Sequence, residues 1–119
     1  MNTRRNKLGR WGEAQAAHYL QERDCVLVAS NWRCPAGEVD LVVRDGDCLV
    51  FVEVRTRRGQ KYGTPEESIT PQKLAHMIAV AETYVYEQGW QGNWRLDVVA
   101  IQVLHGAKPS IAWYENVSL

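Results

Sequence analysis

One segment constrains the fold of this chain more than any other: the stretch GEVDLVVRDGDCLVFVEVRTRR, from Gly37 to Arg58. Apolar residues alternate with other residues on both sides of the Asp45-Gly46 pair, a pattern typical of half-buried strands. An Asp-Gly pair favours a tight hairpin, because a type I′ turn needs positive φ at both central positions. The segment therefore predicts an antiparallel hairpin with strands over 38–44 and 47–56.

Four charged side chains interrupt this hairpin: Glu38, Asp40, Glu53 and Arg55. With Asp45-Gly46 as a two-residue turn, Asp40 faces Phe51, and all four charges lie on one face of the sheet. Asp40 and Glu53 are then diagonal neighbours, about 6–8 Å apart at Cβ. Their carboxylates can therefore reach one common point.

The opposite face of the hairpin is apolar apart from the thiol of Cys48. It carries Val39, Leu41, Val43, Val50, Val52 and Val54. Like charges side by side destabilise a sheet, and burial adds to the cost unless a cation compensates. Oxygen ligands without His or Cys favour Mg²⁺ or Mn²⁺ over zinc. Alternating Glu and Arg are also found as solvated cross-strand pairs, so the hairpin alone leaves both interpretations open.

Two further features favour a partly buried site. Leu49 and Phe51 share the charged face, which is therefore not simply exposed to solvent. A third carboxylate, Glu13, lies at the border of the apolar stripe of a helix predicted over 7–23. If this helix packs on the charged face, Glu13 points to the same place as Asp40 and Glu53.

The rest of the chain predicts a small sheet with two helices. A strand is expected over 25–32, a turn over 34–37 and a polar loop over 57–68. Thr70 and Pro71 predict the start of a second helix, which Gly89 ends, and strands follow over 94–103 and 111–117. The order is αβββαββ, an α/β or α+β arrangement. At 119 residues the chain is expected to form one domain, 1–119.

The formal net charge is zero, which argues against a uniformly basic nucleic-acid-binding surface. Eight of the 14 Lys and Arg residues nevertheless lie in two stretches, 4–10 and 55–61. Together these stretches would make a local positive surface suited to phosphates, although charge alone is equally consistent with solvated ends of elements.

No apolar stretch follows the basic start of the chain, so neither a signal peptide nor a membrane span is expected, and a cytoplasmic protein is the default. The three cysteines, Cys25, Cys34 and Cys48, have no C-x-x-C spacing. We expect reduced thiols; a zinc site that also uses His18 is a weaker alternative.

Five ordered segments carry a resemblance over nearly the whole chain. WGEAQAAHYL, GEVDLVV, FVEVRTRR, the helix around Lys73 and RLDVVAI together resemble the YraN-like family of small, uncharacterised bacterial proteins. More broadly, an acid, a hairpin and Glu-x-(Lys or Arg) resemble the PD-(D/E)xK nucleases, and the layout is similar to that of archaeal Holliday junction resolvases. The resemblance implies a restriction endonuclease-like α/β core with a central mixed five-stranded sheet flanked by helices.

The resemblance also implies roles for particular residues. Asp40 and Glu53 would hold Mg²⁺ or Mn²⁺ with help from the backbone carbonyl of Val54, and Glu13 would complete the acidic cluster. Arg55 stands where the general motif has lysine. Arginine is too basic to accept a proton, but it can clamp a phosphate or stabilise developing negative charge.

The implied activity is metal-dependent hydrolysis of phosphodiester bonds in DNA, branched or structured DNA included. Nucleic-acid contacts are expected from Arg10, Arg57, Arg58, Lys61 and Lys73. The alternatives are a binding module that keeps the nuclease fold without turnover and, for the lysine at 73, a solvated surface position. A homodimer is expected if two sites act on paired strands. For Asp97 a structural ion pair is expected, and for the five tryptophans packing rather than base stacking.

Overall fold

The computed structural model describes residues 3–59 and 69–117, with side chains described from residue 7 onward. In this part of the chain two helices and five strands follow the order predicted from the sequence. They are α1 (Thr3–Gln21), β1 (Val26–Cys34), β2 (Gly37–Asp45), β3 (Cys48–Arg58), α2 (Pro71–Gln88), β4 (Trp94–Val103) and β5 (Ser110–Tyr114). Neither described helix has a long enough apolar stretch to cross a bilayer.

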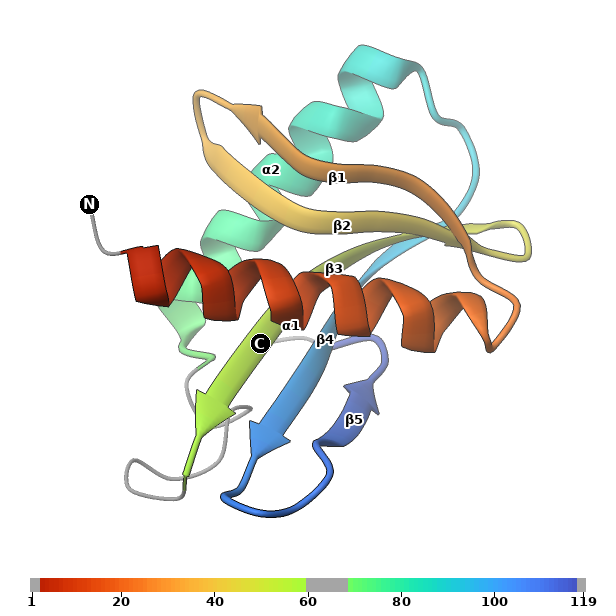
Figure 1. The fold of residues 1–119 in the computed structure, drawn as a ribbon. Helices are drawn as coiled ribbons and strands as arrows, with labels where there is room; N and C mark the ends of the chain where they lie inside the picture. The colour runs from red at the N-terminus through yellow and green to blue at the C-terminus, as the bar shows by residue number, and fades with distance from the viewer. Residues whose placement is uncertain (1–2, 60–68, 118–119) are drawn as a thin grey trace.

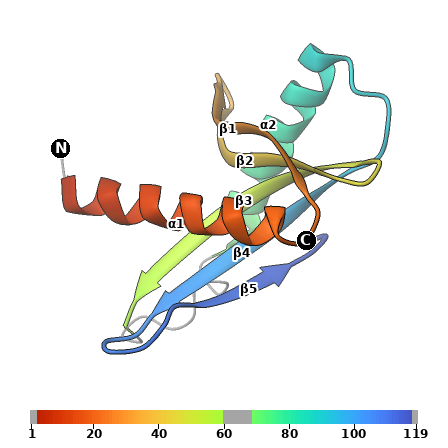
Figure 2. The ribbon, with the colours of Figure 1, turned by 45° about the vertical axis from the view of Figure 1, so that its right-hand side comes forward.

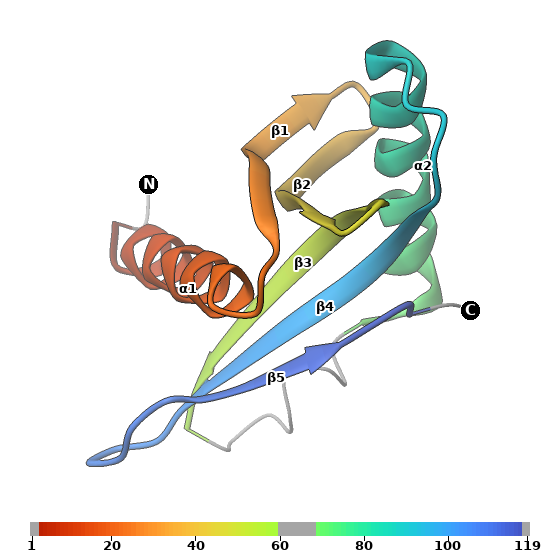
Figure 3. The ribbon, with the colours of Figure 1, turned by 90° about the vertical axis from the view of Figure 1, so that its right-hand side faces the viewer.

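The five strands form one mixed sheet in the order β1-β2-β3-β4-β5. β3 and β4 are parallel, and the other neighbouring pairs are antiparallel. The parallel pair requires a crossover, and α2 lies in that connection. Figure 1 shows α1 crossing the sheet on one side and α2 behind it, and Figure 3 shows the sheet edge-on between the two helices. The chain is therefore a three-layer α/β arrangement.

Helix α2 has the boundaries that its capping residues predict. Thr70 has an extended backbone and its hydroxyl accepts a hydrogen bond from the Lys73 N–H at 3.1 Å, while Pro71 occupies the first turn. Gly89 ends the helix with φ of +65°, in the left-handed region that favours glycine. The helix buries Leu74, Met77, Val80, Ala81 and Tyr84. These residues pack on the sheet face that carries Leu49 and Phe51.

Helix α1 packs on the opposite sheet face from the one predicted. Its buried residues Ala16 and Leu20 contact the valine-rich face of the hairpin. The predicted placement was wrong because α2 covers the apolar part of the charged face, and α1 is left with the fully apolar one. Of the residues assigned to that face, only Val39 lies elsewhere, in the core under α2.

The β2–β3 hairpin has a different register from the predicted one. Asp45 pairs with Cys48, so Gly46, with φ of +61°, and Asp47 form the turn, and Phe51 faces Val42 instead of Asp40. A shift of two residues leaves each side chain on its own face, so alternation cannot detect it. Asp45 also bonds Arg95 on β4 at 2.9 Å, a contact that favours the observed turn.

Strand β3 extends farther than predicted and farther than its partner β2. Arg57 and Arg58 belong to the strand, not to a loop, because they pair with Gln102 and Val103 of β4. The ladder between β2 and β3 stops at Leu41↔Val52. Figure 2 shows β1 and β2 turning away while β3 and β4 continue side by side. The charged residues of β3 therefore lie where β2 no longer accompanies it.

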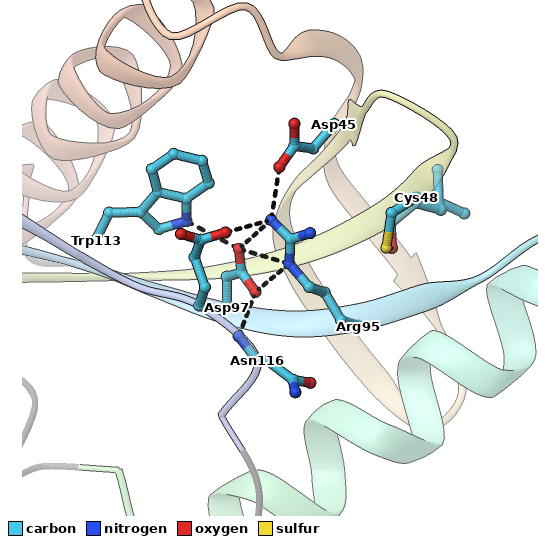
Figure 4. A network of polar contacts seen from close by, with 8 residues as sticks. Asp45, Cys48, Arg95, Asp97, Trp113 and Asn116 are labelled. Atoms are coloured by element: carbon cyan, nitrogen blue, oxygen red, sulfur yellow. Dashed lines mark hydrogen bonds and ion pairs between the residues drawn. The ribbon is translucent and has the colours of Figure 1, made fainter.

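A polar network fixes the other end of the sheet (Figure 4). Asp97 is fully buried and bonds the Arg95 guanidinium at 3.0 Å, the Trp113 indole N–H at 2.8 Å and the Asn116 backbone N–H at 2.8 Å. Arg95 also bonds Asp45 and, at 3.1 Å, Glu115. The structural ion pair expected for Asp97 is confirmed. All five tryptophans pack against the two cores, as expected.

Candidate functional site

Asp40 lies at the point where β2 separates from β3. Its Oδ2 accepts a hydrogen bond from the Val54 N–H at 2.8 Å, in place of a backbone carbonyl of a neighbouring strand. Burial raises the pKa of Asp40 to about 7, and the charge of Glu53 adds to this effect; the Val54 bond acts in the opposite direction. The protein therefore holds a carboxyl group in a place that disfavours its charge.

Glu53 is the one charged side chain of the hairpin that is almost completely buried, with 6% of its surface exposed. Two cations contact the same carboxylate oxygen, Oε2: the Arg55 guanidinium and the Lys73 ammonium, each at 3.4 Å. A buried carboxylate without a cation would be strongly disfavoured, so these two contacts account for its position. The sequence predicted the lysine as a phosphate contact but not its ion pair with Glu53.

Glu13 reaches the same region from α1 on the other side of the sheet. Burial raises its pKa, a hydrogen bond with the Asn31 side chain lowers it, and the charges of Glu38 and Glu53 raise it further. The helix approaches the sheet closely here because Gly12 lies against the Thr56 hydroxyl, where any side chain would collide. Glu13 thus arrives near Asp40 and Glu53 as predicted, although its helix packs on the opposite face.

A pocket of about 460 Å³ brings these groups together. It is lined by Leu8, Gly9, Glu13, Asp40, Glu53, Val54, Arg55, Thr56, Arg57 and Arg58. One side of the pocket is α1 and the other is the part of β3 beyond the end of the β2–β3 ladder. Three carboxyl groups and three guanidinium groups therefore surround one cavity.

The carboxyl groups do not form a closed three-ligand metal cluster. Within residues 3–59 and 69–117, no three His, Cys, Asp or Glu side chains are arranged to hold a metal ion. Cys25, Cys34 and Cys48 are free thiols, and no zinc cluster with His18 is present in that part of the chain. Asp40, Glu53 and the Val54 carbonyl offer only oxygen donors, a set that suits Mg²⁺ or Mn²⁺. Burial and, after it, the charge of Glu53 raise the pKa of Asp40, and a divalent cation would relieve the repulsion between the two carboxylates.

The predicted nucleic-acid contacts are only partly gathered at this pocket. Arg57 and Arg58 line it, and Lys73 touches Glu53 from α2. Arg10 is exposed on α1 and is not among the lining residues. Lys61 lies outside the described residues.

Sequence reasoning missed Asn31, which positions Glu13. Asn31 has φ of +52° in the middle of β1, a conformation that asparagine tolerates better than most residues. Asn31 lies opposite Asp40 in the β1–β2 ladder, between the pairs Ser30↔Leu41 and Trp32↔Val39. An asparagine within a predicted strand was the available signal, but it does not by itself indicate a hydrogen bond to Glu13.

A sequence model for the family described as "Uncharacterised protein family UPF0102" matches residues 12–101. The chain belongs to this family. The match runs from the close contact at Gly12 to Ile101 within β4. It therefore includes Glu13, Asp40, Glu53, Arg55 and Lys73.

Curated UPF0102 relatives cover most of the chain. A UPF0102 protein of Roseiflexus castenholzii is 51% identical over 87% of this chain and 85% of its own length. One from Herpetosiphon aurantiacus is 38% identical over 97% and 96%, and one from Pelotomaculum thermopropionicum 48% identical over 82% of each chain. Each of these relatives is named only as a UPF0102 protein.

Proposed function

We propose that this protein is a metal-dependent nuclease, built on a restriction endonuclease-like core, that hydrolyses phosphodiester bonds of DNA. The observation that carries the proposal is the pocket itself, in which Asp40 and the buried Glu53 lie beside three arginines of one strand. Anionic ligands for a cation and cationic contacts for phosphates are the two requirements of phosphodiester hydrolysis.

Asp40, Glu53 and the Val54 carbonyl would hold the metal ion. A bound Mg²⁺ or Mn²⁺ would polarise a phosphoryl oxygen and lower the pKa of a water molecule. To serve as a ligand, Glu53 would give up at least one of its two ion pairs, with Arg55 or with Lys73. The side chain released from that pair would then place a positive charge next to the substrate phosphate.

Arg55 and Glu13 have separate tasks in this proposal. Arg55 donates to the phosphate and stabilises the negative charge that develops there, since a guanidinium group does not take up protons. Glu13 lines the pocket beside Asp40 and Glu53, and burial raises its pKa above the ordinary value of a glutamate. We assign Glu13 the task of taking the proton from the attacking water.

One observation favours a second candidate, a nucleic-acid-binding module without turnover. Glu53 is already neutralised by Lys73 and Arg55, and arginine occupies the position of the motif lysine. In such a module the carboxylates are not ligands, and removing one of them reduces repulsion of phosphates. Binding would then survive or improve in the Asp40→Asn and Glu53→Gln variants.

The test is cleavage of end-labelled linear, flapped and four-way-junction DNA, with single-stranded RNA alongside, in Mg²⁺ and in Mn²⁺. Asp40→Asn and Glu53→Gln are run in parallel with Asp47→Asn, which removes an exposed carboxylate from the turn of the same hairpin. We expect cutting by the parent and by Asp47→Asn, and a loss of at least about 100-fold in the two pocket variants. Binding without any cutting would favour the second candidate, and equal cutting by all four proteins would remove the chemistry from this pocket.

A further inference from the structure

The C-terminal half of β3 has a partner on one edge only within the described structure. Its ladder with β2 stops at Leu41↔Val52, whereas its ladder with β4 continues to Arg58↔Val103. Beyond the end of the β2 ladder, the edge of β3 borders the pocket that Glu13 and Asp40 also line. An unpaired strand edge presents a row of backbone donors and acceptors to whatever lies beside it.

The direction of the backbone groups follows from two hydrogen bonds. The Gly59 N–H bonds the Val103 carbonyl of β4 at 2.8 Å, and the Val54 N–H bonds Asp40 on the β2 side at 2.8 Å. Backbone groups of alternate residues in a strand point to the same edge. The N–H groups of Thr56 and Arg58 therefore point to the open edge, in line with that of Val54.

Two arginine side chains flank this edge with donors that have no partner among residues 3–59 and 69–117. The Nε atoms of Arg55 and Arg57 are both buried and make no hydrogen bond in the described structure. Both residues line the pocket, and both project from the same face of β3 because they are two residues apart. A buried donor without an acceptor is costly, and an anion that draws the guanidinium toward itself removes that cost.

The spacing of these arginine side chains and backbone N–H groups suits a polyanion. Residues i and i+2 of a strand are about 6.6–6.8 Å apart, and both the arginines and the open N–H groups follow this spacing. Regularly spaced charges that flank a row of N–H donors suit a chain of phosphates, which are the main contacts of nucleic-acid-binding proteins.

We infer that the open edge of β3 binds the phosphate backbone of one nucleic-acid strand laid along it. The phosphate at Arg55, beside Asp40 and Glu53, is the one that is cut, and the adjacent phosphate lies at Arg57. The inference rests on the proposed function and adds to it a direction and a second phosphate subsite. It involves no contact with bases, so binding at this edge is independent of sequence.

The first arm of the test measures binding without cleavage. A fluorescent single-stranded oligonucleotide is titrated in EDTA at several NaCl concentrations, with the parent, Arg57→Gln, Arg57→Lys and Arg44→Gln. Arg44 is an exposed arginine near the far end of the hairpin and serves as the control. We expect Arg57→Gln to reduce the slope of log K against log[salt] by about 0.7, the contribution of one phosphate contact with a single strand. Arg57→Lys, which keeps the charge, and Arg44→Gln should keep the parent slope.

The second arm locates the subsite during cleavage in Mn²⁺. Single neutral methylphosphonates replace the phosphates next to the cut bond, one position at a time. One such position should slow the parent about tenfold and leave Arg57→Gln unaffected, since a contact removed from either side shows non-additive effects.

The outcomes separate the inference from the proposed function. If the parent cuts DNA but Arg57→Gln behaves like Arg44→Gln in both arms, the subsite is wrong and the nuclease stands. If the salt slopes change as expected but nothing is cut, the subsite stands and the second candidate function gains. If no nucleic acid binds, both are overturned.

Discussion

The side chain of Asp40 accepts a backbone hydrogen bond from β3 that the carbonyl of a neighbouring strand would normally accept. Its carboxylate accepts the Val54 N–H at 2.8 Å, where β2 has already left β3. The same group is buried near Glu53, which disfavours its charged form. The Asp40 carboxylate is thus both the acceptor for a backbone N–H and a candidate metal ligand. Protonation of this carboxylate affects the hydrogen bond and the metal binding differently.

We expect Asp40→Asn to raise the free energy of unfolding at pH 8 by about 1–3 kcal/mol in the absence of divalent cations. Asparagine keeps an acceptor for Val54 but removes the charge. The pKa of Asp40 is raised in the folded protein to about 7 from 3.8. Its contribution to stability is therefore fully present below about pH 4 and is lost as the pH rises through 7. The advantage of the variant should accordingly disappear toward pH 4.

Urea unfolding from pH 4 to 8 measures this difference, with Asp47→Asn as the exposed control. A constant difference across the whole range would contradict the assigned cause.

Lys73 is the residue whose removal should strengthen metal binding. Its ammonium group contacts Glu53 Oε2 at 3.4 Å and competes with a cation for that oxygen. In Lys73→Gln we expect Mn²⁺ to bind about two- to fivefold more tightly, a range that matches the strength of a partly exposed ion pair. Mn²⁺ titration by calorimetry, with Lys73→Arg as the charge-preserving control, gives the comparison. Equal Mn²⁺ affinity in the parent and in Lys73→Gln would show that the ion pair does not compete.

The candidate residues were largely predictable, but their contacts were not. Strand alternation placed Asp40, Glu53 and Arg55 together, because the observed register differs from the predicted one by two residues and such a shift leaves each side chain on its own face. The hydrogen bond from the Val54 N–H to Asp40 depends on where the β2–β3 ladder ends. Sheet twist and packing determine that point, and no local sequence pattern predicts it. The Asn31 bond to Glu13 joins two elements and was equally out of reach.

At the scale of elements, the approach of α1 to β3 is set by one residue. Gly12 lies against Thr56 so closely that a Cβ atom would overlap the Thr56 hydroxyl. The next residue is Glu13. Because Gly12 has no side chain, α1 comes close to β3, and this close approach determines how far the Glu13 carboxylate reaches.

We expect Gly12→Ala to lower the free energy of unfolding by about 1–3 kcal/mol, because α1 or β3 must move to admit the methyl group. Adding Thr56→Ala should recover part of this loss, since the overlapping hydroxyl is gone. Gly9→Ala in the same helix is the matched control: nothing lies within 4 Å of its Cβ position, and alanine is the better helix former. Denaturant unfolding of the parent, Gly12→Ala, Thr56→Ala, the double variant and the Gly9→Ala control tests the contact, and additive effects of the two substitutions would refute it.

The element boundaries followed from local signals where such signals exist. Thr70, Pro71 and Gly89 fixed α2 because capping is a local interaction. The polar composition after Thr56 predicted a loop where β3 continues. Arg57 and Arg58 are strand residues only because they pair with β4. The face chosen by α1 was also a tertiary outcome, decided by competition between two helices for two sheet faces.

At the scale of the whole molecule, the two ends of the sheet serve different purposes. The end with the Arg95 network is closed by mutually satisfied charges, while the other end holds the pocket. The network joins β4 to the hairpin turn through Asp45 and to the segment after β5 through the Asn116 backbone N–H.

We expect Asp97→Asn to cost about 2–4 kcal/mol of stability, because it leaves Arg95 without its buried partner. Glu115→Gln, which removes an exposed partner of the same arginine, should cost less than about 1 kcal/mol. Urea unfolding measures both values. Since the network lies away from the pocket, DNA cleavage per folded molecule should stay at the parent level in both variants, and a selective loss of cleavage in Asp97→Asn would contradict this division.

The open edge of β3 also bears on the solubility of the protein. Unpaired edges are the places where sheets of separate molecules join and aggregate, and charged side chains are a common protection. Arg55, Arg57 and Arg58 place three positive charges along this edge, so a second copy of the strand meets like charge there. Variants that neutralise several of these arginines should therefore be followed for self-association as well as for lost function.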